Sequence, residues 1–409
     1  MTDERIRALE RSVANAPGDA TMRLSLAREL ARAGRRDDAR GHLAGVLRAE
    51  PLSADAVRML DDLGFEPLAH DAPWPTPDGQ NDRARRSAHP GARRGELVKR
   101  IRIGRDGETA SSMTVGAATV YVASSSQRLI ALDVATGSPR WIRDFQTLLG
   151  APVIGEGERL FVVADGKPQL LDGARGETLW SARYTDEPAH TLFAPRGLAL
   201  VVSGDLIHAL DVTSGAVKWR FKTSGALHAC PVADGSAIFV AGARGAVEAL
   251  GFDGKVISRV RVPQGAVGDL MLLGDALVMS CRRDPDERMT FLVARDGCKL
   301  GKKTPLTGLV ALACAVDASR FLAGGPGSVI YSARGESVPV DDDGWTSSTI
   351  SDSGSCIFGQ SMRGLLWGDS TGSLVKTIFP GAHDTTAMAI GPDSTLLVAS
   401  PRGILHVIA

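Results

Sequence analysis

Short apolar runs that end at turn residues recur along the chain after about residue 95. Each run has three to five residues and is rich in aliphatic and β-branched side chains, which is typical of buried strands. The runs come in pairs, with a short turn between the two members. The pattern predicts eight strand pairs, namely Val120–Ala123 with Leu129–Asp133, Leu160–Val163 with Gln169–Asp172, Leu198–Val202 with Ile207–Asp211, Ile238–Ala241 with Val247–Leu250, Leu277–Ser280 with Phe291–Ala294, Arg320–Ala323 with Val329–Tyr331, Cys356–Gly359 with Leu365–Trp367, and Leu396–Ser400 with Ile404–Ile408.

A turn of fixed composition follows each of the first three pairs. It contains an aspartate, then a glycine, then a tryptophan at the start of the next predicted strand. The three aspartates are 39 residues apart each time, and so are the three tryptophans. A period of about 40 residues with strand–turn–strand content is typical of propeller blades. The repeated residues are Asp133, Gly137, Trp141, Asp172, Gly176, Trp180, Asp211, Gly215 and Trp219.

The period also predicts the number of blades. Eight units in about 315 residues give about 39 residues for each blade, which accommodates four short strands. Ala409 directly follows the third strand of the eighth unit, so we expect Leu97–Ile103 to supply the fourth strand and close the ring without an open edge. We therefore predict an all-β eight-bladed propeller over residues 96–409. Seven blades, which would require two units to merge, are the alternative.

The phrase Leu-Asp-x-x-(Thr/Ser)-Gly-x-x-x-Trp and the run Val120–Ala123 resemble the repeats of the PQQ-like, or quinoprotein-type, β-propeller family. The match is specific in the first three units and fades later; the last unit, with His383 and Asp384, resembles a WD-repeat blade. We expect each tryptophan to pack between adjacent blades. We expect each aspartate to hold its turn through side-chain-to-backbone hydrogen bonds. These residues are therefore assigned a structural role and not a catalytic one.

Residues 1–65 instead show helical periodicity. Apolar side chains at helical spacing predict four helices, over about residues 3–15, 19–33, 37–50 and 53–63. Residues 20–51 resemble a tetratricopeptide repeat, although the positions that are usually aromatic hold Arg23 and Leu43. The resemblance implies a protein-docking module; a helical cap or oligomerisation arm is the alternative. The residues that carry the resemblance are Leu26, Ala27, Leu30, Gly34, Ala39, Leu43 and Pro51.

Residues 66–95 are rich in proline, glycine and charge and have almost no aliphatic side chains. Such a composition predicts a disordered, semi-extended linker between the helical domain and the propeller. Trp74 lies between two prolines and is a candidate docking residue, which either folds back onto the propeller or is exposed. The arginines of this segment could contact an acidic partner or RNA. A solvated linker is favoured, because no aromatic residues alternate with them for base stacking.

Charge and composition indicate which binding partners and which cellular compartment to expect. The chain has 47 basic and 47 acidic residues and so no net charge, which gives no general attraction to nucleic acid or anionic membranes. The N-terminus lacks the pattern of a signal peptide, and no run of 18 apolar residues predicts a membrane span. The five cysteines are scattered and odd in number, which favours free thiols in a reducing compartment. We therefore expect a cytoplasmic protein without membrane insertion.

Catalytic chemistry has to be considered because the resemblance includes quinone-dependent dehydrogenases. The resemblance implies calcium or lanthanide ligands that include asparagine, but asparagine occurs only at Asn15 and Asn81, outside the propeller. The eight histidines lack metal-binding spacing, and no phosphate-binding or nucleophile motif occurs. The acidic run Asp341–Asp343 has no EF-hand spacing, so an exposed loop is favoured over a cation site. The polar segment 282–288, with Arg282 and Arg283, is predicted as a solvated loop or a partner contact.

The sequence thus predicts a non-catalytic scaffold of a bacterial multiprotein complex, in which the propeller and the helical arm both bind other proteins. No cofactor, no metal and no nucleic acid are expected, and self-association through the helical arm is possible. The alternative is a propeller enzyme that binds a small molecule or quinone. Nothing in the sequence identifies the partner proteins.

Overall fold

We analysed a computed structural model of the 409-residue chain. Strands dominate the described part of the chain, and the described helices α1 (Thr2–Asn15) and α2 (Ala20–Arg32) precede them. The structure describes residues 2–16, 19–33, 35, 39, 42–43, 46, 59, 72, 74, 76, 85–87, 89–148, 150–182, 190–194, 196–262, 266–284, 287–296, 298–306, 311–317, 319–324, 328–332, 334–340, 349–353, 356–361, 364–380 and 385–409.

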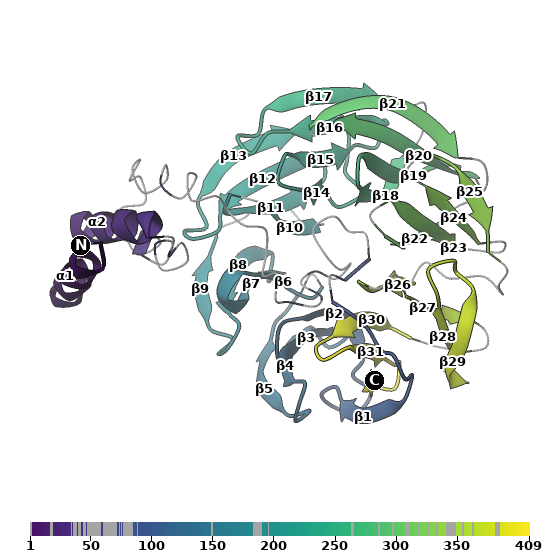
Figure 1. Ribbon diagram of the computed structural model, residues 1–409, viewed down its shortest axis with the longest axis horizontal. Helices are drawn as coiled ribbons and strands as arrows, with labels where there is room; N and C mark the ends of the chain where they lie inside the picture. Colours follow the sequence, from purple (N-terminus) through teal and green to yellow (C-terminus); the bar gives the residue numbers. More distant parts are fainter. Residues whose placement is uncertain are drawn as a thin grey trace.

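Eight four-stranded antiparallel sheets are arranged as a ring, each forming one blade (Figure 1). The prediction of eight blades is confirmed and the seven-blade alternative is wrong, because every predicted unit has a sheet of its own. Blade 1 contains β2 (Ala110–Val115), β3 (Thr119–Ser124), β4 (Arg128–Asp133) and β5 (Pro139–Asp144). Blade 2 contains β6 (Val153–Gly155), β7 (Arg159–Ala164), β8 (Lys167–Asp172) and β9 (Thr178–Ser181). A short 3-10 turn, η1 (Glu156–Glu158), joins β6 to β7.

The next three blades continue in chain order. Blade 3 contains β10 (His190–Ala194), β11 (Leu198–Ser203), β12 (Leu206–Asp211) and β13 (Val217–Lys222). Blade 4 contains β14 (Val232–Ala233), β15 (Ile238–Ala241), β16 (Ala246–Leu250) and β17 (Val256–Arg261). Blade 5 has the longest strands, which are β18 (Ala266–Leu273), β19 (Ala276–Asp284), β20 (Glu287–Asp296) and β21 (Lys299–Leu306).

The last three blades return to the start of the ring. Blade 6 contains β22 (Ala311–Ala315), β23 (Arg320–Gly324), β24 (Val329–Ser332) and β25 (Ser337–Pro339). Blade 7 contains β26 (Ile350–Ser351), β27 (Ile357–Ser361), β28 (Gly364–Gly368) and β29 (Leu374–Pro380). Blade 8 contains β30 (Ala387–Gly391), β31 (Thr395–Ala399), β32 (Ile404–Ile408) and, from the other end of the domain, β1 (Leu97–Arg102).

Burial differs between the middle strands of a blade and the strand at the rim. All six residues of β3 are buried, whereas β5 alternates between exposed and partly buried side chains. The middle strands are covered on both faces by neighbouring blades, so they need apolar residues at almost every position. The rim strands pack with only one face, which leaves the other face to water. This difference explains why the middle strands carry the strongest sequence signal.

The ring closes where β1 pairs with β32. Ile101 lies opposite Leu405 and Arg102 opposite Ile404, in antiparallel register. The turn before β1 adds further bonds, because the amides of residues 94–96 all donate to the carbonyl of Ala409. The Ile103 amide donates to the Gly403 carbonyl at 2.8 Å. The closing strand therefore leaves no unpaired edge between the first and last strands of the ring.

A buried ion pair lies at this closure, in the segment that joins β1 to blade 1. Glu108 accepts hydrogen bonds from the Arg128 guanidinium at 2.7 Å, from the Arg105 amide at 2.9 Å and from the Ser124 hydroxyl. Glu108 and Arg128 are both buried. Burial alone would raise the pKa of Glu108, but the bonds from Ser124 and Arg105 and the charge of Arg128 outweigh it and lower this pKa.

We predict that Glu108→Gln lowers the free energy of unfolding by about 3 kcal/mol near neutral pH, because Arg128 loses its buried partner. The folded pKa of Glu108 lies below its usual 4.5, so the stabilisation is present above that pH and is lost as the pH falls through the folded pKa. Denaturant unfolding of both proteins across acid pH measures the difference, which should narrow as the pH falls. Asp106→Asn, at an exposed ion pair with Arg102, is the matched control and should have little effect. A difference that stays constant with pH would contradict this prediction.

The helices α1 and α2 precede the ring and lie to one side of it (Figure 1). Asp19 caps α2 by accepting a hydrogen bond from the Met22 amide at 3.0 Å. Further along the chain, Ala39, His42, Leu43, Val46 and Met59 are helical where the structure describes them. We call these helical residues the helical arm. A single hydrophobic cluster packs them together, and its buried members are Ile6, Val13, Ala20, Leu26, Ala27, Leu30, Ala39, Leu43 and Val46.

The described residues of segment 66–95 pack against the ring. Trp74 is 1% exposed, and its amide and carbonyl pair with those of Val115 at the end of β2. Further along, Arg86 forms a parallel bridge with Ser351 of β26. These contacts attach the segment, which we call the strap, to the inner strands of blades 1 and 7. Ala72, Thr76, Ser87 and Ala92 of the strap are also buried.

Asp352, directly after β26, anchors the end of the strap. Its carboxylate is fully buried and accepts hydrogen bonds from the Gly91 amide at 2.8 Å and the Cys356 amide at 2.9 Å. The Arg93 guanidinium forms an ion pair with it at 2.6 Å. The expectation of a solvated linker is therefore wrong for the described strap residues. The described residues of this segment are ordered, although they include few aliphatic side chains, because the ring supplies the apolar surface and the buried charge.

We predict that Trp74→Ala releases the strap while the ring stays folded. Loss of a buried tryptophan costs about 3–5 kcal/mol, and this loss falls on the contacts that attach the strap. Tryptic cleavage after Arg86, followed by mass spectrometry, should therefore be at least about 100-fold faster. Leu179→Ala, at an exposed rim position, should leave cleavage unchanged. An unchanged rate in the Trp74 variant would show that the strap does not depend on this residue.

Candidate interaction surfaces

The repeated aspartates form the turns between the third and fourth strands of blades 1 to 3. Asp133 accepts hydrogen bonds from the amide and hydroxyl of Thr136 at 2.8 and 3.1 Å, and pairs with Arg140 at 2.7 Å. The bond from the Thr136 amide, followed by the bond from Arg140, lowers the pKa of Asp133 to about 2. The carboxylate is therefore ionised at all physiological pH values, and its hydrogen bonds stabilise the turn in which it lies.

The other two aspartates have the same environment. Asp172 accepts hydrogen bonds from the amides of Ala174 and Arg175 at 2.9 and 3.0 Å. Asp211 accepts them from the amides of Thr213 and Ser214 at 3.0 and 2.9 Å. All three side chains thus bond to backbone amides two or three residues onward, the geometry of an Asx turn. None of these contacts points to a substrate.

The repeated tryptophans lie at the joints between blades. The indole nitrogen of Trp141 donates to the Gly173 carbonyl of the next blade at 2.8 Å. Trp180 and Trp219 make the same bond to the carbonyls of Val212 and Phe252, also at 2.8 Å. Each indole therefore fastens its own blade to the turn of the next one, and its ring packs on that turn.

The repeated glycines make room for these indoles. Gly176 has a φ of +72°, and a Cβ atom there would lie 2.7 Å from Cδ2 of Trp141. Gly215 faces Trp180, and Gly254 faces Trp219, with similarly close approaches. Each turn therefore requires glycine for two reasons. Its backbone is left-handed, and the indole ring lies too close to leave room for a Cβ atom.

Two further joints use aliphatic residues in place of tryptophan, and the sequence pattern did not reveal them. A Cβ atom on Gly137 of blade 1 would lie 3.0 Å from Cγ1 of Ile101 in the closing strand. A Cβ atom on Gly372 of blade 7 would lie 2.8 Å from Cγ1 of Val340 in blade 6. The only signal in the sequence is an aliphatic residue in or next to a rim strand, which is too common to be recognised without the fold. The repeated tryptophans and glycines thus form blade joints, and the repeated aspartates stabilise turns.

We predict that Gly176→Ala lowers the free energy of unfolding by about 2–4 kcal/mol. A left-handed alanine costs about 1 kcal/mol, and its Cβ atom also displaces the indole of Trp141. Gly166→Ala is the matched control, because Gly166 has a φ of +68° with no atom within 4 Å of the new Cβ atom. It should cost only about 1 kcal/mol. Equal losses in denaturant unfolding would show that the joint does not depend on this close contact.

The candidate docking residues Arg282 and Arg283 lie on strand β19, in the hairpin that extends blade 5. The predicted loop is wrong at residues 282–284 and 287–288, because β19 continues to Asp284 and β20 begins at Glu287, whereas the alternative of a partner contact stays a prediction. The pairing of β19 with β20 continues with Arg282 opposite Arg288. The extra residues of this blade therefore lengthen its two middle strands. The side chains of residues 282–288 and the acidic run 341–343 lie outside the described part of the chain.

The third candidate docking residue, Trp74, is covered by the ring. It belongs to the hydrophobic cluster at the junction of blades 7, 8 and 1, together with Phe358 and Ile390. A partner could reach this indole only after the strap had left the ring. In the structure Trp74 is therefore an internal anchor of the strap.

Exposed apolar side chains lie along the rim of the ring. They belong to the fourth strands of several blades, where one strand edge remains unpaired with a further strand. An exposed strand edge with apolar side chains is a surface on which another protein can bind. The rim residues are Leu97, Val98, Ile142, Leu179, Val217, Val256, Ile257, Val338, Leu374 and Val375.

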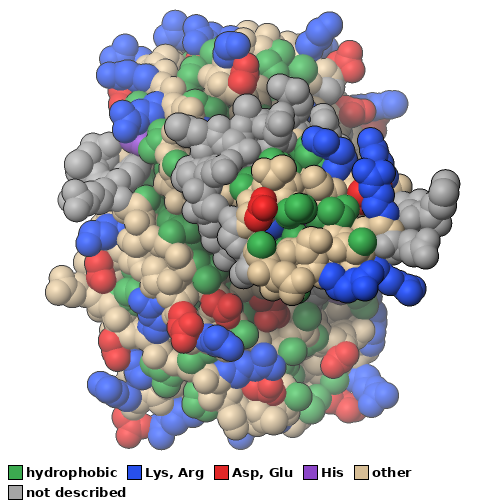
Figure 2. Space-filling model, turned by 90° about the vertical axis from the view of Figure 1, so that its left-hand side faces the viewer, with side chains coloured by type: hydrophobic (Ala, Val, Ile, Leu, Met, Phe, Trp, Pro, Cys, Tyr) green, Lys and Arg blue, Asp and Glu red, His purple; other side chains and the backbone are tan. Residues whose placement is uncertain are grey.

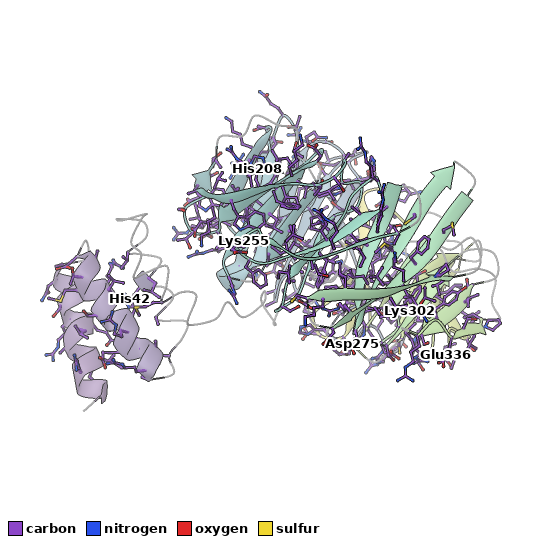
Figure 3. All side chains as sticks on the ribbon, turned by 90° about the horizontal axis from the view of Figure 1, so that it is seen from above. His42, His208, Lys255, Asp275, Lys302 and Glu336 are labelled. Atoms are coloured by element: carbon purple, nitrogen blue, oxygen red, sulfur yellow. The ribbon has the colours of Figure 1, made fainter. Side chains whose placement is uncertain are left out.

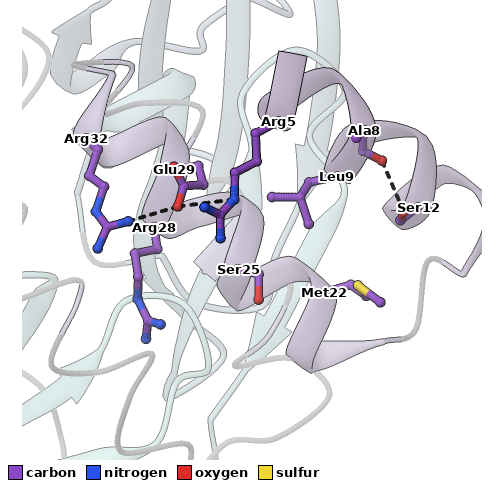
Figure 4. Close-up of a pocket in the computed structure, with 9 residues that line it drawn as sticks. All are labelled: Arg5, Ala8, Leu9, Ser12, Met22, Ser25, Arg28, Glu29 and Arg32. Atoms are coloured by element: carbon purple, nitrogen blue, oxygen red, sulfur yellow. Dashed lines mark hydrogen bonds and ion pairs between the residues drawn. The ribbon is translucent and has the colours of Figure 1, made fainter. Parts of the chain in front are cut away.

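A pocket of about 520 Å³ lies between α1 and α2 of the helical arm (Figure 4). Glu29 in its wall is 7% exposed and forms ion pairs with Arg32 at 2.9 Å and Arg5 at 3.7 Å. Figure 2, which views the molecule from the side of the helices, shows apolar side chains bordered by Lys and Arg. The pocket is lined by Arg5, Ala8, Leu9, Ser12, Met22, Ser25, Arg28, Glu29 and Arg32.

Groups that could carry chemistry are dispersed. Among the described residues no three His, Cys, Asp or Glu side chains gather where they could hold a metal ion. His42 lies in the helical arm and His208 in blade 3, far from each other (Figure 3). Burial raises the pKa of the Cys281 thiol to about 11 and that of Cys314 to about 12, so both stay protonated. The described helices include none long and apolar enough to cross a membrane.

Eight antiparallel blades, Asx turns and tryptophan–glycine joints define the class of the protein. It is a β-propeller built from PQQ-like repeats, preceded by a short helical arm. The sequence pattern of the family described as outer membrane protein assembly factor BamB matches residues 88–208 and 203–302. These matches cover more than half of the 409 residues, so the chain belongs to this family.

Solved structures show the same fold. The crystal structure of BamB from Moraxella catarrhalis matches with a TM-score of 0.56 and 18% sequence identity, covering 76% of this chain and 97% of that one. The computationally designed Ika8 protein matches with a TM-score of 0.60 and 14% identity, covering 75% of this chain and 98% of that one. At these identities the likeness concerns the fold alone. No curated protein sequence matches the chain significantly.

Proposed function

We propose that this protein is a non-catalytic scaffold of a bacterial multiprotein complex, and that its propeller and its helical arm each bind a partner protein. The observation that carries the proposal is the contrast between the ring and its surroundings. The most regular polar residues of the ring are committed to turns and blade joints, whereas the rim and the arm expose apolar and charged groups. The family match supports it, because that family is described as an assembly factor.

The helical arm is the more specific half of the proposal. We treat it as a degenerate tetratricopeptide-like unit, since the buried residues Leu26, Ala39 and Leu43 share one cluster and a pocket opens between α1 and α2. A small helical stack of this kind gains stability from neighbouring helices, which a partner protein or a second copy of the chain can supply. Self-association through the arm is therefore the competing use of the same surface.

We extend the proposal to a reducing, cytoplasmic compartment. All five cysteines are free thiols, and burial keeps two of them protonated, which suits such a compartment. The family description refers to outer membrane protein assembly, which would require a different location. Fractionation of cells that express the tagged protein distinguishes the two locations.

We predict that deletion of residues 1–65 removes one set of partners and leaves the ring folded. The hydrophobic cluster of the arm is separate from those of the ring, so the thermal transition of the ring should hardly change. Affinity purification of the tagged full chain and the truncated chain, followed by mass spectrometry, compares their partners. Retention of every partner by the truncated chain would contradict the role of the arm. A cofactor absorbance in the purified full chain would contradict the non-catalytic assignment.

A further inference from the structure

The pocket between α1 and α2 has two chemically different ends (Figure 4). At one end, Arg5 and Arg32 converge on Glu29, and Arg28 lies beside them with its guanidinium pointing away from Glu29. The other end has apolar and hydroxyl-bearing residues, which are Ala8, Leu9, Ser12 and Met22. A pocket of about 520 Å³ accommodates a few side chains of a bound segment, and not a folded domain.

The charged end carries an excess of positive charge. Glu29 is largely buried, whereas the side chains of Arg5 and Arg32 remain 69% and 64% exposed. The single carboxylate orients two guanidinium groups and neutralises only one of the three arginines. The exposed faces of these groups therefore remain able to bind carboxylates, for which a planar guanidinium is well suited.

The apolar end favours a peptide as the occupant. The relative solvent-accessible surface of Met22 is 39%, and Leu9 is only partly buried against the hydrophobic cluster of the arm. Methionine adapts its shape to varied apolar partners. A ligand that satisfies both ends must therefore carry negative charge next to an apolar side chain.

We propose that this pocket binds a short acidic peptide segment of a partner protein, with carboxylates on Arg5, Arg28 and Arg32 and an apolar side chain beside Leu9 and Met22. The inference rests on the proposed scaffold function and specifies the chemistry of one partner. Nucleic acid is disfavoured as the occupant for two reasons. The wall contains the carboxylate of Glu29, and none of the nine described lining residues is aromatic, so bases have no side chain on which to stack.

Fluorescence anisotropy with the full-length protein tests the proposal. The probe is a fluorescein-labelled peptide of about ten residues that is rich in glutamate and contains leucine. We expect saturable binding that weakens as NaCl rises from about 0.05 to about 0.5 M, because the guanidinium groups are exposed and therefore screened. A peptide with glutamine in place of glutamate should bind much more weakly. Equal binding of the two peptides would overturn the proposal.

Substitutions locate the binding site. Arg28→Gln leaves both ion pairs of Glu29 in place and should weaken binding about threefold. Arg5→Gln combined with Arg32→Gln should weaken it about tenfold, with circular dichroism confirming that the arm is folded. Arg11→Gln is the matched control, since Arg11 lies on α1 but does not line the pocket, and it should bind the peptide normally. Equal weakening by Arg11→Gln and Arg28→Gln would show that general charge attraction explains the binding.

A single-stranded oligonucleotide of about ten nucleotides serves as the competing probe. Tighter binding of this probe than of the acidic peptide, with the same sensitivity to Arg28→Gln, would overturn the peptide proposal. Failure of the peptide to bind while partner capture still requires residues 1–65 would refute the acidic chemistry and leave the scaffold function intact. Peptide binding without any partner that depends on residues 1–65 would support the pocket and refute the proposed role of the arm.

Discussion

The pairing of β1 with β32 is the interaction on which the ring depends. A ring of sheets is stable only when each blade packs against two neighbours, and an unclosed ring would expose the faces of its first and last blades. Here the closing strand forms a ladder with the last strand, places Ile101 against Gly137 of blade 1, and leads into the buried Glu108–Arg128 pair. Hydrogen bonding, packing and charge thus coincide at one place, and the fold of every other blade relies on this closure.

Much of the fold could be predicted from the sequence because the blades share one physical requirement. At five joints, a side chain in or next to a rim strand packs closely against the glycine turn of the next blade. Tryptophan meets this requirement at three joints, and its fixed spacing predicted the blade length and number. Ile101 and Val340 meet it elsewhere with ordinary aliphatic side chains, so the sequence pattern fades while the geometry persists. For this reason the tryptophan-containing repeat was specific only in the first three blades, whereas the family pattern extends to residue 302.

The strap and the pocket could not be predicted, because both depend on surfaces contributed by distant residues. Composition predicted that segment 66–95 cannot form a core of its own, and this prediction did not consider what the ring could supply. The ring provides the missing partners, with Val115 for the backbone of Trp74 and the buried Asp352 for Gly91 and Arg93. The pocket likewise requires the antiparallel approach of α1 and α2, which places Arg5 near Glu29.

The attachment of the strap changes how the arm and the ring can cooperate. A flexible linker of 30 residues would let the two binding surfaces move widely, which lowers the effective concentration of one relative to the other. The contacts of Trp74 with Val115 and of Arg86 with Ser351 attach the described strap residues to the ring, which shortens the part of the chain that can serve as a tether. If one partner binds both surfaces as proposed, a shorter tether makes its two weak contacts reinforce each other more strongly. Under the proposed scaffold function, the strap therefore contributes to partner binding by limiting the tether, although its own tryptophan is buried.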